Sequence, residues 1–282
     1  MPRYLRVKVS RALTRSGLYD LDYAYNPYGG CVHACLYCYA RYYTPYREVA
    51  EKWGEVVYIK ENIVEVLSRE VRRLRPGVVG VSTTTDPYQP VEAEETLTRK
   101  GLEVLLSAGF RVSIQTKSPL VTRDLDLLAP YRGRVDVGFT ITTLDDEAAS
   151  AIEPRAPPPS SRAKALADVA GAGLETWVFL GPILRGVNDS EESIREVAEL
   201  ALETGSKLYY DYLHLKPGLE KHLAPVLAEY PRAASTPPSW RRAVEERVER
   251  ICREIGLTCE PAFPRRKASA KLTDFYFQQS NT

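Results

Sequence analysis

Hydrophobic and polar positions follow two alternating periods along residues 22–216: short apolar runs are repeatedly followed by segments with one apolar face. The runs predict six strands, at residues 22–26, 78–82, 111–115, 135–141, 176–180 and 208–213. Strands that alternate with helices indicate a parallel sheet with right-handed crossovers. The pattern therefore predicts an α/β fold.

The helical segments are recognised by their spacing and their ends. Between the first two strands, apolar residues recur from Ile63 to Leu74, and Pro76 stops the pattern. Further helices are expected over 91–108, 122–129 and 161–172, and after Asp189, where Glu192 three residues on would complete a capping box.

The two ends of the chain depart from this alternation. Residues 1–21 read as a basic extension with alternating apolar positions, either an edge strand or packed tail or a poorly ordered terminus. Residues 22–218 form the alternating domain, and residues 219–282 are expected to form a helical cap and a tail. The cap contains one long helix with an apolar face that includes Trp240, Val244 and Val248.

Polar residues gather where the predicted strands end, a place that parallel sheets share along one rim. They include Thr83 to Asp86, 116–118, 140–143, 181–182 and His214. Ligands bind at such a rim, and the arrangement favours a partial (β/α)6 barrel. Asp86 reads as a ligand of a ribose hydroxyl or the substrate or as a helix cap, Glu92 as a helix cap, and His214 as a substrate-site candidate or a hydrogen-bonded histidine.

Composition removes several classes of protein. The 38 Lys and Arg residues nearly balance the 37 Asp and Glu residues, and the net charge of +1 gives no general attraction to polyanions. The sequence has no apolar stretch of membrane-span length and no signal-peptide core, which predicts a cytoplasmic protein. One methionine and abundant Arg, Glu and Pro are typical of thermophile proteins.

Three of the five cysteines lie within eight residues, at the spacing C-x3-C-x2-C. Cys31, Cys35 and Cys38 follow a turn signal and a glycine pair, and such close thiolates converge on a metal centre. Three thiolates suit an iron-sulfur cluster better than zinc, which normally takes a fourth protein ligand. A structural zinc loop and three unconnected core cysteines are the alternatives, and His33 reads as a loop residue.

Cys252 and Cys259 lie far from this loop in the sequence. They read as free core residues first, then as a disulfide, and last as thiols that fold back toward the site.

The cysteine motif resembles that of the radical S-adenosylmethionine (radical SAM) superfamily, whose hallmark is this spacing with an aromatic residue beside the third cysteine, here Tyr39. The resemblance implies that Cys31, Cys35 and Cys38 hold a 4Fe-4S cluster whose fourth iron binds S-adenosylmethionine. It also implies a partial (β/α)6 barrel of the radical SAM type. The expected activity is reductive cleavage of S-adenosylmethionine to a 5'-deoxyadenosyl radical, with electrons from an external flavodoxin-type or ferredoxin-type reductant.

Further segments resemble the branch related to spore photoproduct lyase. They are residues 85–92, 98–99, 116–118, 123–125, 152–155, 162 and 182–183. The resemblance implies that Thr85, Lys117 and Thr140 bind S-adenosylmethionine, and Tyr39 has a position beside it. Thr83 stands where the lyase carries a cysteine that returns a hydrogen atom to the product radical, which puts the lyase reaction itself in doubt.

Two classes of function follow from these features. The first is a radical enzyme that abstracts hydrogen from an unidentified substrate, with a nucleic acid lesion or a nucleotide as one candidate. Arg72, Arg73 and Arg75, with Arg265 to Lys267, would then be contacts, although solvated charge on a helix and a tail is the favoured explanation of these residues. The alternative is a non-catalytic iron-sulfur protein for electron transfer or sensing, against which the missing fourth cysteine counts.

Overall fold

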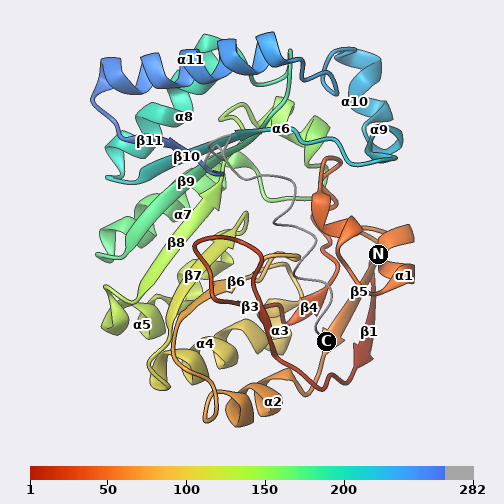
Figure 1. The fold of residues 1–282 in the computed structure, drawn as a ribbon, viewed down its shortest axis with the longest axis vertical. Helices are drawn as coiled ribbons and strands as arrows, with labels where there is room; N and C mark the ends of the chain where they lie inside the picture. The colour runs from red at the N-terminus through yellow and green to blue at the C-terminus, as the bar shows by residue number, and fades with distance from the viewer. Residues whose placement is uncertain (264–282) are drawn as a thin grey trace, which may run out of the picture.

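The structure is a computed structural model that describes residues 1–263. Six parallel strands lie side by side in chain order and form most of an eight-stranded sheet (Figure 1). They are β3 (Tyr23–Tyr25), β6 (Val78–Val81), β7 (Arg111–Thr116), β8 (Val135–Thr140), β9 (Glu175–Ile183) and β10 (Lys207–Tyr212). The predicted strands and their parallel pairing are confirmed, except that β9 continues through Gly181 and Pro182.

The sheet is an open, curved α/β sheet. A short antiparallel strand, β2 (Leu13–Arg15), pairs with β3 at one edge, and β11 (Cys259–Pro261) pairs with β10 at the other. In Figure 1 the longer helices lie along the outer side of this sheet. They are α2 (Ile63–Glu70), α4 (Leu97–Ser107), α7 (Pro159–Gly171) and α8 (Glu191–Glu203). Alternate strand residues such as Ile114, Phe139 and Val178 are fully buried beneath them, as expected for a sheet covered by crossover helices.

One predicted helix is two helices in the structure. The segment 91–108 breaks at Thr96, which has a left-handed φ of 54°, into α3 (Glu92–Glu95) and α4. The Glu92 carboxylate accepts hydrogen bonds from the backbone N–H groups of Thr98 (2.9 Å) and Arg99 (3.2 Å), in the first turn of α4. Glu92 is therefore a helix cap, as predicted, and the helix that it caps is the second one.

Two other helix predictions were wrong in detail. Pro119 and Pro130 flank the segment expected to be helical over 122–129, and proline lacks the backbone N–H that an α-helix needs. This segment forms η2 (Pro119–Asp124), a short α5 (Leu125–Leu128) and η3 (Ala129–Tyr131). At α8 the cap is Ser190, whose Oγ accepts from the N–H of Ser193, so the capping box at Asp189 does not form.

A second, three-stranded sheet lies beside β3. It consists of β1 (Arg3–Val7), β5 (Val56–Lys60) and β4 (Tyr28–Gly29), in that spatial order. Residues 3–7 thus form an edge strand, the first of the two alternatives for this extension. Because β4 leads directly into the cysteines, this sheet positions the cysteine loop, and η1 (Tyr39–Tyr42) and α1 (Arg47–Glu51) follow the loop.

The C-terminal helices lie in two places. Helix α11 (Pro238–Ile255) packs along α8, and Val244 and Val248 of its predicted apolar face are buried. Two short helices, α9 (Leu219–His222) and α10 (Ala224–Glu229), contribute Leu219 and Val226 to an apolar cluster that includes Cys35. The short α6 (Asp146–Ile152) joins the same cluster through Ile152.

The two remote cysteines are bonded to each other. Cys252 near the end of α11 forms a disulfide with Cys259 of β11, so the first interpretation, free core thiols, was wrong. None of the helices in residues 1–263 combines the length and the apolar character that crossing a membrane requires. The predicted contacts Arg265, Arg266 and Lys267 lie outside the described residues, and the domain boundaries stay a prediction.

Candidate metal centre

The cysteine loop lies at the carboxyl end of β3 and carries three free cysteines. Cys31 and Cys35 are each 7% exposed, and Cys38 is half-buried. Burial, with the neighbouring Glu153 and Cys38, raises the pKa of the Cys35 thiol to about 12, although Lys117 opposes this rise. A metal is the usual partner that makes a buried thiol ionise. Within residues 1–263, no three His, Cys, Asp or Glu side chains stand arranged to hold a single ion.

Backbone N–H groups point at two of the three thiols. The N–H of His33 donates to the Cys31 sulfur, and the N–H groups of Ala40 and Arg41 donate to the Cys38 sulfur, which lowers the pKa that burial raises. Such N–H donors stabilise thiolates and tune iron-sulfur clusters. Three free thiols with N–H donors fit the donor set of a cluster that keeps one iron open.

Two side chains from the segment after β6 fix the cysteine loop. Gln89 is fully buried, accepts from the N–H of Val32 (3.1 Å) and donates to the carbonyl of Gly30 (3.1 Å). The Thr85 hydroxyl donates to the same carbonyl (2.6 Å). Gly30 has a φ of +92°, which favours glycine, and a Cβ there would lie 2.7 Å from the Val56 carbonyl oxygen. The loop is therefore held by its neighbours before any ligand binds.

Asp86 joins the ends of β6 and β7 beneath this loop. Its carboxylate accepts from the Thr116 hydroxyl (2.7 Å) and the Lys117 N–H (2.8 Å), and lies 3.4 Å from Nδ1 of His33. Burial opposes its charge, but His33 and these donors outweigh burial and lower the pKa of Asp86 to about 2. Both carboxylate oxygens are thus engaged inside the protein. These contacts are those of a supporting residue, and a direct role toward substrate stays a prediction.

A buried ion network lies next to Cys35. Glu153 accepts from the Tyr37 hydroxyl and pairs with Arg162, and its Oε1 lies 3.9 Å from Nζ of Lys117. Glu153 and Arg162 are fully buried, and Lys117 largely so. Burial opposes the charge of Lys117, but Cys35 and Glu153 outweigh it and raise its pKa. Lys117 therefore stays cationic beside the thiols.

Thr140 and Tyr39 also border the loop or its supports. The Thr140 hydroxyl accepts from Nε2 of Gln115 (3.1 Å), and its carbonyl accepts from Arg162 (3.1 Å). Tyr39 is 50% exposed, and its hydroxyl donates to the carbonyl of Thr83 (2.6 Å). Four predicted residues, Thr83, Thr85, Lys117 and Thr140, thus lie at or just after the ends of three neighbouring parallel strands.

His214 lies farther along the same rim. It is exposed and bonded to the carboxylate of Asp211 (3.0 Å). The basic residues Arg72, Arg73 and Arg75 directly precede β6, at the amino end of the sheet. They therefore lie opposite the rim, where they are not placed to contact a substrate bound beside the cysteines.

Sequence reasoning missed the roles of three residues at this site. Asn26 follows β3, and its Oδ1 accepts from the N–H groups of Thr83 (3.0 Å) and Thr84 (2.9 Å). Glu153 and Arg162 stood in the matched segments without an assigned role. A glutamate or arginine indicates a functional role when it is buried, and its burial is known only from the structure.

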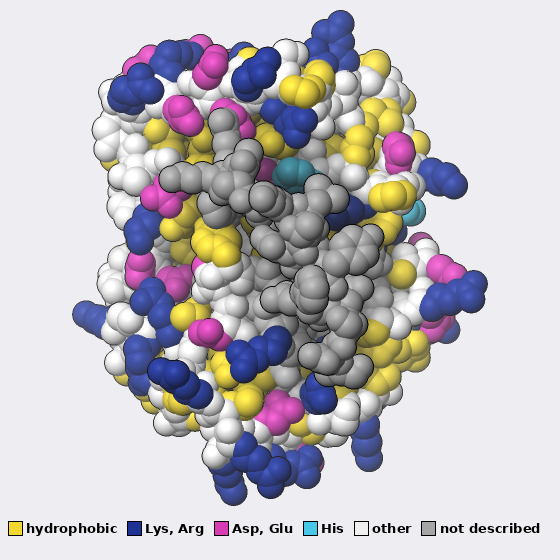
Figure 2. All heavy atoms as spheres, in the orientation of Figure 1, with side chains coloured by type: hydrophobic (Ala, Val, Ile, Leu, Met, Phe, Trp, Pro, Cys, Tyr) yellow, Lys and Arg dark blue, Asp and Glu magenta, His cyan; other side chains and the backbone are white. Residues whose placement is uncertain are grey.

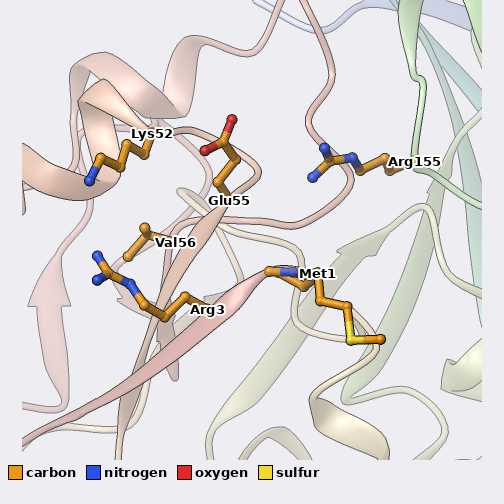
Figure 3. Close-up of a pocket in the computed structure, with 7 residues that line it drawn as sticks. Met1, Arg3, Lys52, Glu55, Val56 and Arg155 are labelled. Carbon is orange, nitrogen blue, oxygen red and sulfur yellow. The ribbon is translucent and has the colours of Figure 1, made fainter.

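A cavity of about 630 Å³ opens beside strands β1 and β5, and residues of both strands line it. Figure 3 shows Arg3 and Lys52 on one side of it, Arg155 on the other, and Glu55 and Val56 between them. None of the residues predicted to bind a cofactor lines this cavity, so it is distinct from the predicted cofactor site.

A sequence profile described as Radical SAM superfamily matches residues 25–201. An uncharacterized protein of Methanocaldococcus jannaschii is 29% identical over 251 residues, covering 88% of this chain and 92% of its own length. An uncharacterized protein of Mycobacterium bovis is 30% identical over 268 residues, covering 88% of this chain and 79% of its own.

Two solved structures resemble the fold. A spore photoproduct lyase variant with bound S-adenosylmethionine and dinucleoside spore photoproduct has a TM-score of 0.66 at 16% identity, covering 92% of this chain and 81% of its own. A radical SAM methyltransferase from Sphaerobacter thermophilus has a TM-score of 0.57 at 19% identity, covering 86% and 66%. At these identities the likeness concerns the fold.

Proposed function

The chain belongs to the radical SAM superfamily, and from this premise we propose that it abstracts a hydrogen atom from its substrate after reductive cleavage of S-adenosylmethionine. Enzymes of this family use a 4Fe-4S cluster and S-adenosylmethionine, which together supply that cleavage. The observation that supports the proposal most is the loop with three free, largely buried cysteines and backbone N–H donors. Cys31, Cys35 and Cys38 would hold the cluster.

We assign Lys117 and Thr140 to S-adenosylmethionine, and their surroundings support this assignment. Lys117 keeps its positive charge beside Cys35 and would pair with the cofactor's carboxylate. The Thr140 hydroxyl accepts one bond and donates none to a described residue, so its proton is available to a carboxylate. Thr85 already donates to Gly30 and accepts from Gln89, which supports a role in holding the loop.

For the substrate and the reductant we propose only a chemical class. An external one-electron donor of the flavodoxin or ferredoxin type would supply the electrons. The fold likeness to spore photoproduct lyase favours a nucleic acid lesion or a nucleotide as substrate. Thr83 would face that substrate, but an alcohol does not readily return a hydrogen atom.

The proposal is tested with protein purified anaerobically and reconstituted with iron and sulfide. We expect about four irons per chain, a change in the cluster's electron paramagnetic resonance spectrum when S-adenosylmethionine is added, and 5'-deoxyadenosine after reduction with dithionite. Stoichiometric zinc without iron would contradict the ligand set. A stable cluster that neither binds nor cleaves S-adenosylmethionine would favour the alternative, an electron-transfer or sensing protein.

Residue 83 separates this chain from the lyase. We expect the unmodified protein to cleave S-adenosylmethionine slowly and without coupling, and to repair spore photoproduct poorly. Thr83→Cys places a hydrogen donor at that position, and repair measured by chromatography of the dinucleoside product should rise. Efficient repair by the unmodified protein, indifferent to residue 83, would show that another residue donates the hydrogen.

A further inference from the structure

Three tyrosines lie exposed directly after the last cysteine of the loop. Tyr39, Tyr42 and Tyr43 are 50%, 39% and 57% exposed. Side chains of this size are normally buried, and exposed rings that gather beside a site mark a binding surface. Folding alone does not account for their position.

Two of these rings continue into a row of aromatic and cationic side chains. The rings of Tyr39 and Tyr43 meet edge to face at 5.9 Å, and Nζ of Lys216 lies 5.5 Å from the centre of the Tyr43 ring. Farther along, the rings of Tyr212 and His214 are 5.0 Å apart. We call this row the aromatic strip: Tyr39, Tyr43, Lys216, His214, Tyr212 and Arg241.

In the middle of the strip, His214 lies close enough to Asp211, Arg241 and Lys216 for their charges to act on it. The hydrogen bonds to Asp211 raise the pKa of His214, and the nearby charges of Arg241 and Lys216 oppose that rise. The Arg241 guanidinium also lies 5.4 Å from the centre of the Tyr212 ring. The strip thus combines segments that are far apart in the sequence: the exit of the cysteine loop, the end of β10 and the start of α11.

The two cations of the strip have no acidic partner of their own. Neither Lys216 nor Arg241 lies within ion-pair distance of a carboxylate among residues 1–263. Other surface cations are paired, as Arg250 is with Glu191, and Figure 2 shows positive and negative side chains interspersed over the upper half of the face in view. Unpaired cations between exposed rings are therefore available to an anionic ligand that also has flat apolar faces.

One end of the strip reaches the candidate site. The Tyr39 hydroxyl bonds the carbonyl of Thr83, and Tyr39 directly follows Cys38. A long ligand that lay along the strip would thus have one unit next to the cysteine loop.

We propose that the aromatic strip binds a single-stranded nucleic acid, with bases stacked on its rings and phosphates paired with Lys216 and Arg241. Single-stranded binding surfaces combine stacking rings with cations in this way, whereas a duplex hides its base faces. The inference rests on the proposed function in one respect: binding along the strip would bring one nucleotide to the candidate site. Binding itself does not depend on the cluster's chemistry.

The test is fluorescence anisotropy with a fluorescein-labelled oligothymidylate of about 15 nucleotides and the reconstituted full chain. Tyr43→Ala should weaken binding about tenfold, because one stacked base is lost, whereas Tyr43→Phe should bind like the unmodified protein. Lys216→Gln should reduce the slope of log Kd against log salt by about 0.7. Tyr19→Ala and Arg72→Gln, which change an exposed ring and a cation elsewhere, are the matched controls and should leave Kd unchanged.

Several results would overturn the inference. They are no binding of the oligonucleotide, equal loss in the control variants, a Tyr43→Phe variant as weak as Tyr43→Ala, or equally tight binding of polyglutamate, which would indicate a surface for an acidic protein. Cleavage of S-adenosylmethionine by the unmodified protein, assayed without oligonucleotide, reports on the proposed function separately. Cleavage without oligonucleotide binding rejects only the strip, and binding without cleavage rejects only the enzyme.

Discussion

The cysteine loop and the α8–α11 face use the same residue types in opposite ways. The loop has three free cysteines beside a buried ion network, Glu153 with Arg162 and Lys117. On the α8–α11 face the two cysteines form a disulfide, and the ion pairs are exposed. These pairs include Arg250 with Glu191 (2.7 Å) and Arg195 with Glu254 (2.5 Å).

The difference shows which region sacrifices folding stability for function. A surface pair contributes at most about 1 kcal/mol and costs little to keep. A buried pair must overcome the desolvation of both ions, and apolar residues would often be as stable. Retaining Glu153, Arg162 and Lys117 beneath the cysteines therefore indicates a requirement for positioned charge, whereas the α8–α11 pairs are explained by helix packing alone.

The largest expected effect separates the two sets of cysteines. Cys31→Ala removes one of only three thiolates, so reconstituted protein should lose the cluster together with its visible absorption. Cys252→Ala is the matched control and should keep its iron, measured by colorimetric assay. Iron loss in Cys252→Ala would mean that the ligand set is wrong.

Breaking the buried network should lower the free energy of unfolding far more than breaking an exposed ion pair. Glu153→Gln leaves Arg162 and Lys117 without their buried counter-ion and should lower the free energy of unfolding by about 3–5 kcal/mol. Glu254→Gln, on the α8–α11 face, should lower it only slightly, because solvent screens an exposed pair. Urea titrations of the two variants measure this difference, and equal losses would remove the contrast between the regions.

Lys117 tests whether the buried charge serves the cofactor. Lys117→Ala removes one charge-assisted bond, so affinity for S-adenosylmethionine should fall by about 1.5–3 kcal/mol while the iron content is unchanged. Isothermal titration of the oxidised, reconstituted protein measures the affinity. Unaltered binding would place the cofactor's carboxylate elsewhere.

The smallest effect concerns an exposed pair on the rim. Asp211 raises the pKa of His214, so the pair stabilises the fold below the ordinary histidine pKa of about 6.5 and loses that contribution as pH rises through the raised pKa. Asp211→Asn should lower the pKa of His214, followed by NMR titration, and should cost no more than about 1 kcal/mol at pH 5. A pKa that does not move would show that Asp211 is not its cause.

Much of the parallel sheet could be predicted because buried strands are apolar runs with clear ends. Ile114, Phe139 and Val178 lie in such runs, and the polar residues after them mark the rim. The break at Thr96 could not be predicted from local preference, because it depends on Glu92 reaching forward to a second helix. The strand β5 is also an apolar run, but it was not among the predicted strands, and its partners, β1 and β4, are distant in sequence or very short.

Some features of the candidate site could likewise be predicted from the sequence, and others could not. The cysteine spacing is local and could be read directly, and so could the position of Lys117 after a strand. The pairing of Glu153 with Arg162 depends on the packing of α7 against the end of β8, and the aromatic strip joins three segments that only the fold brings together. Which polar residues are buried is a property of tertiary structure, and the sequence contains no signal for it.

The open sheet has a consequence for solubility. A sheet that does not close leaves two edges whose unpaired backbone groups are templates for aggregation with other chains. Both edges here carry strands of only three residues, β2 and β11, and Pro261 in β11 has no N–H to offer a neighbour. The disulfide from α11 ties β11 to this edge, so we expect it to protect the protein against self-association as well as unfolding.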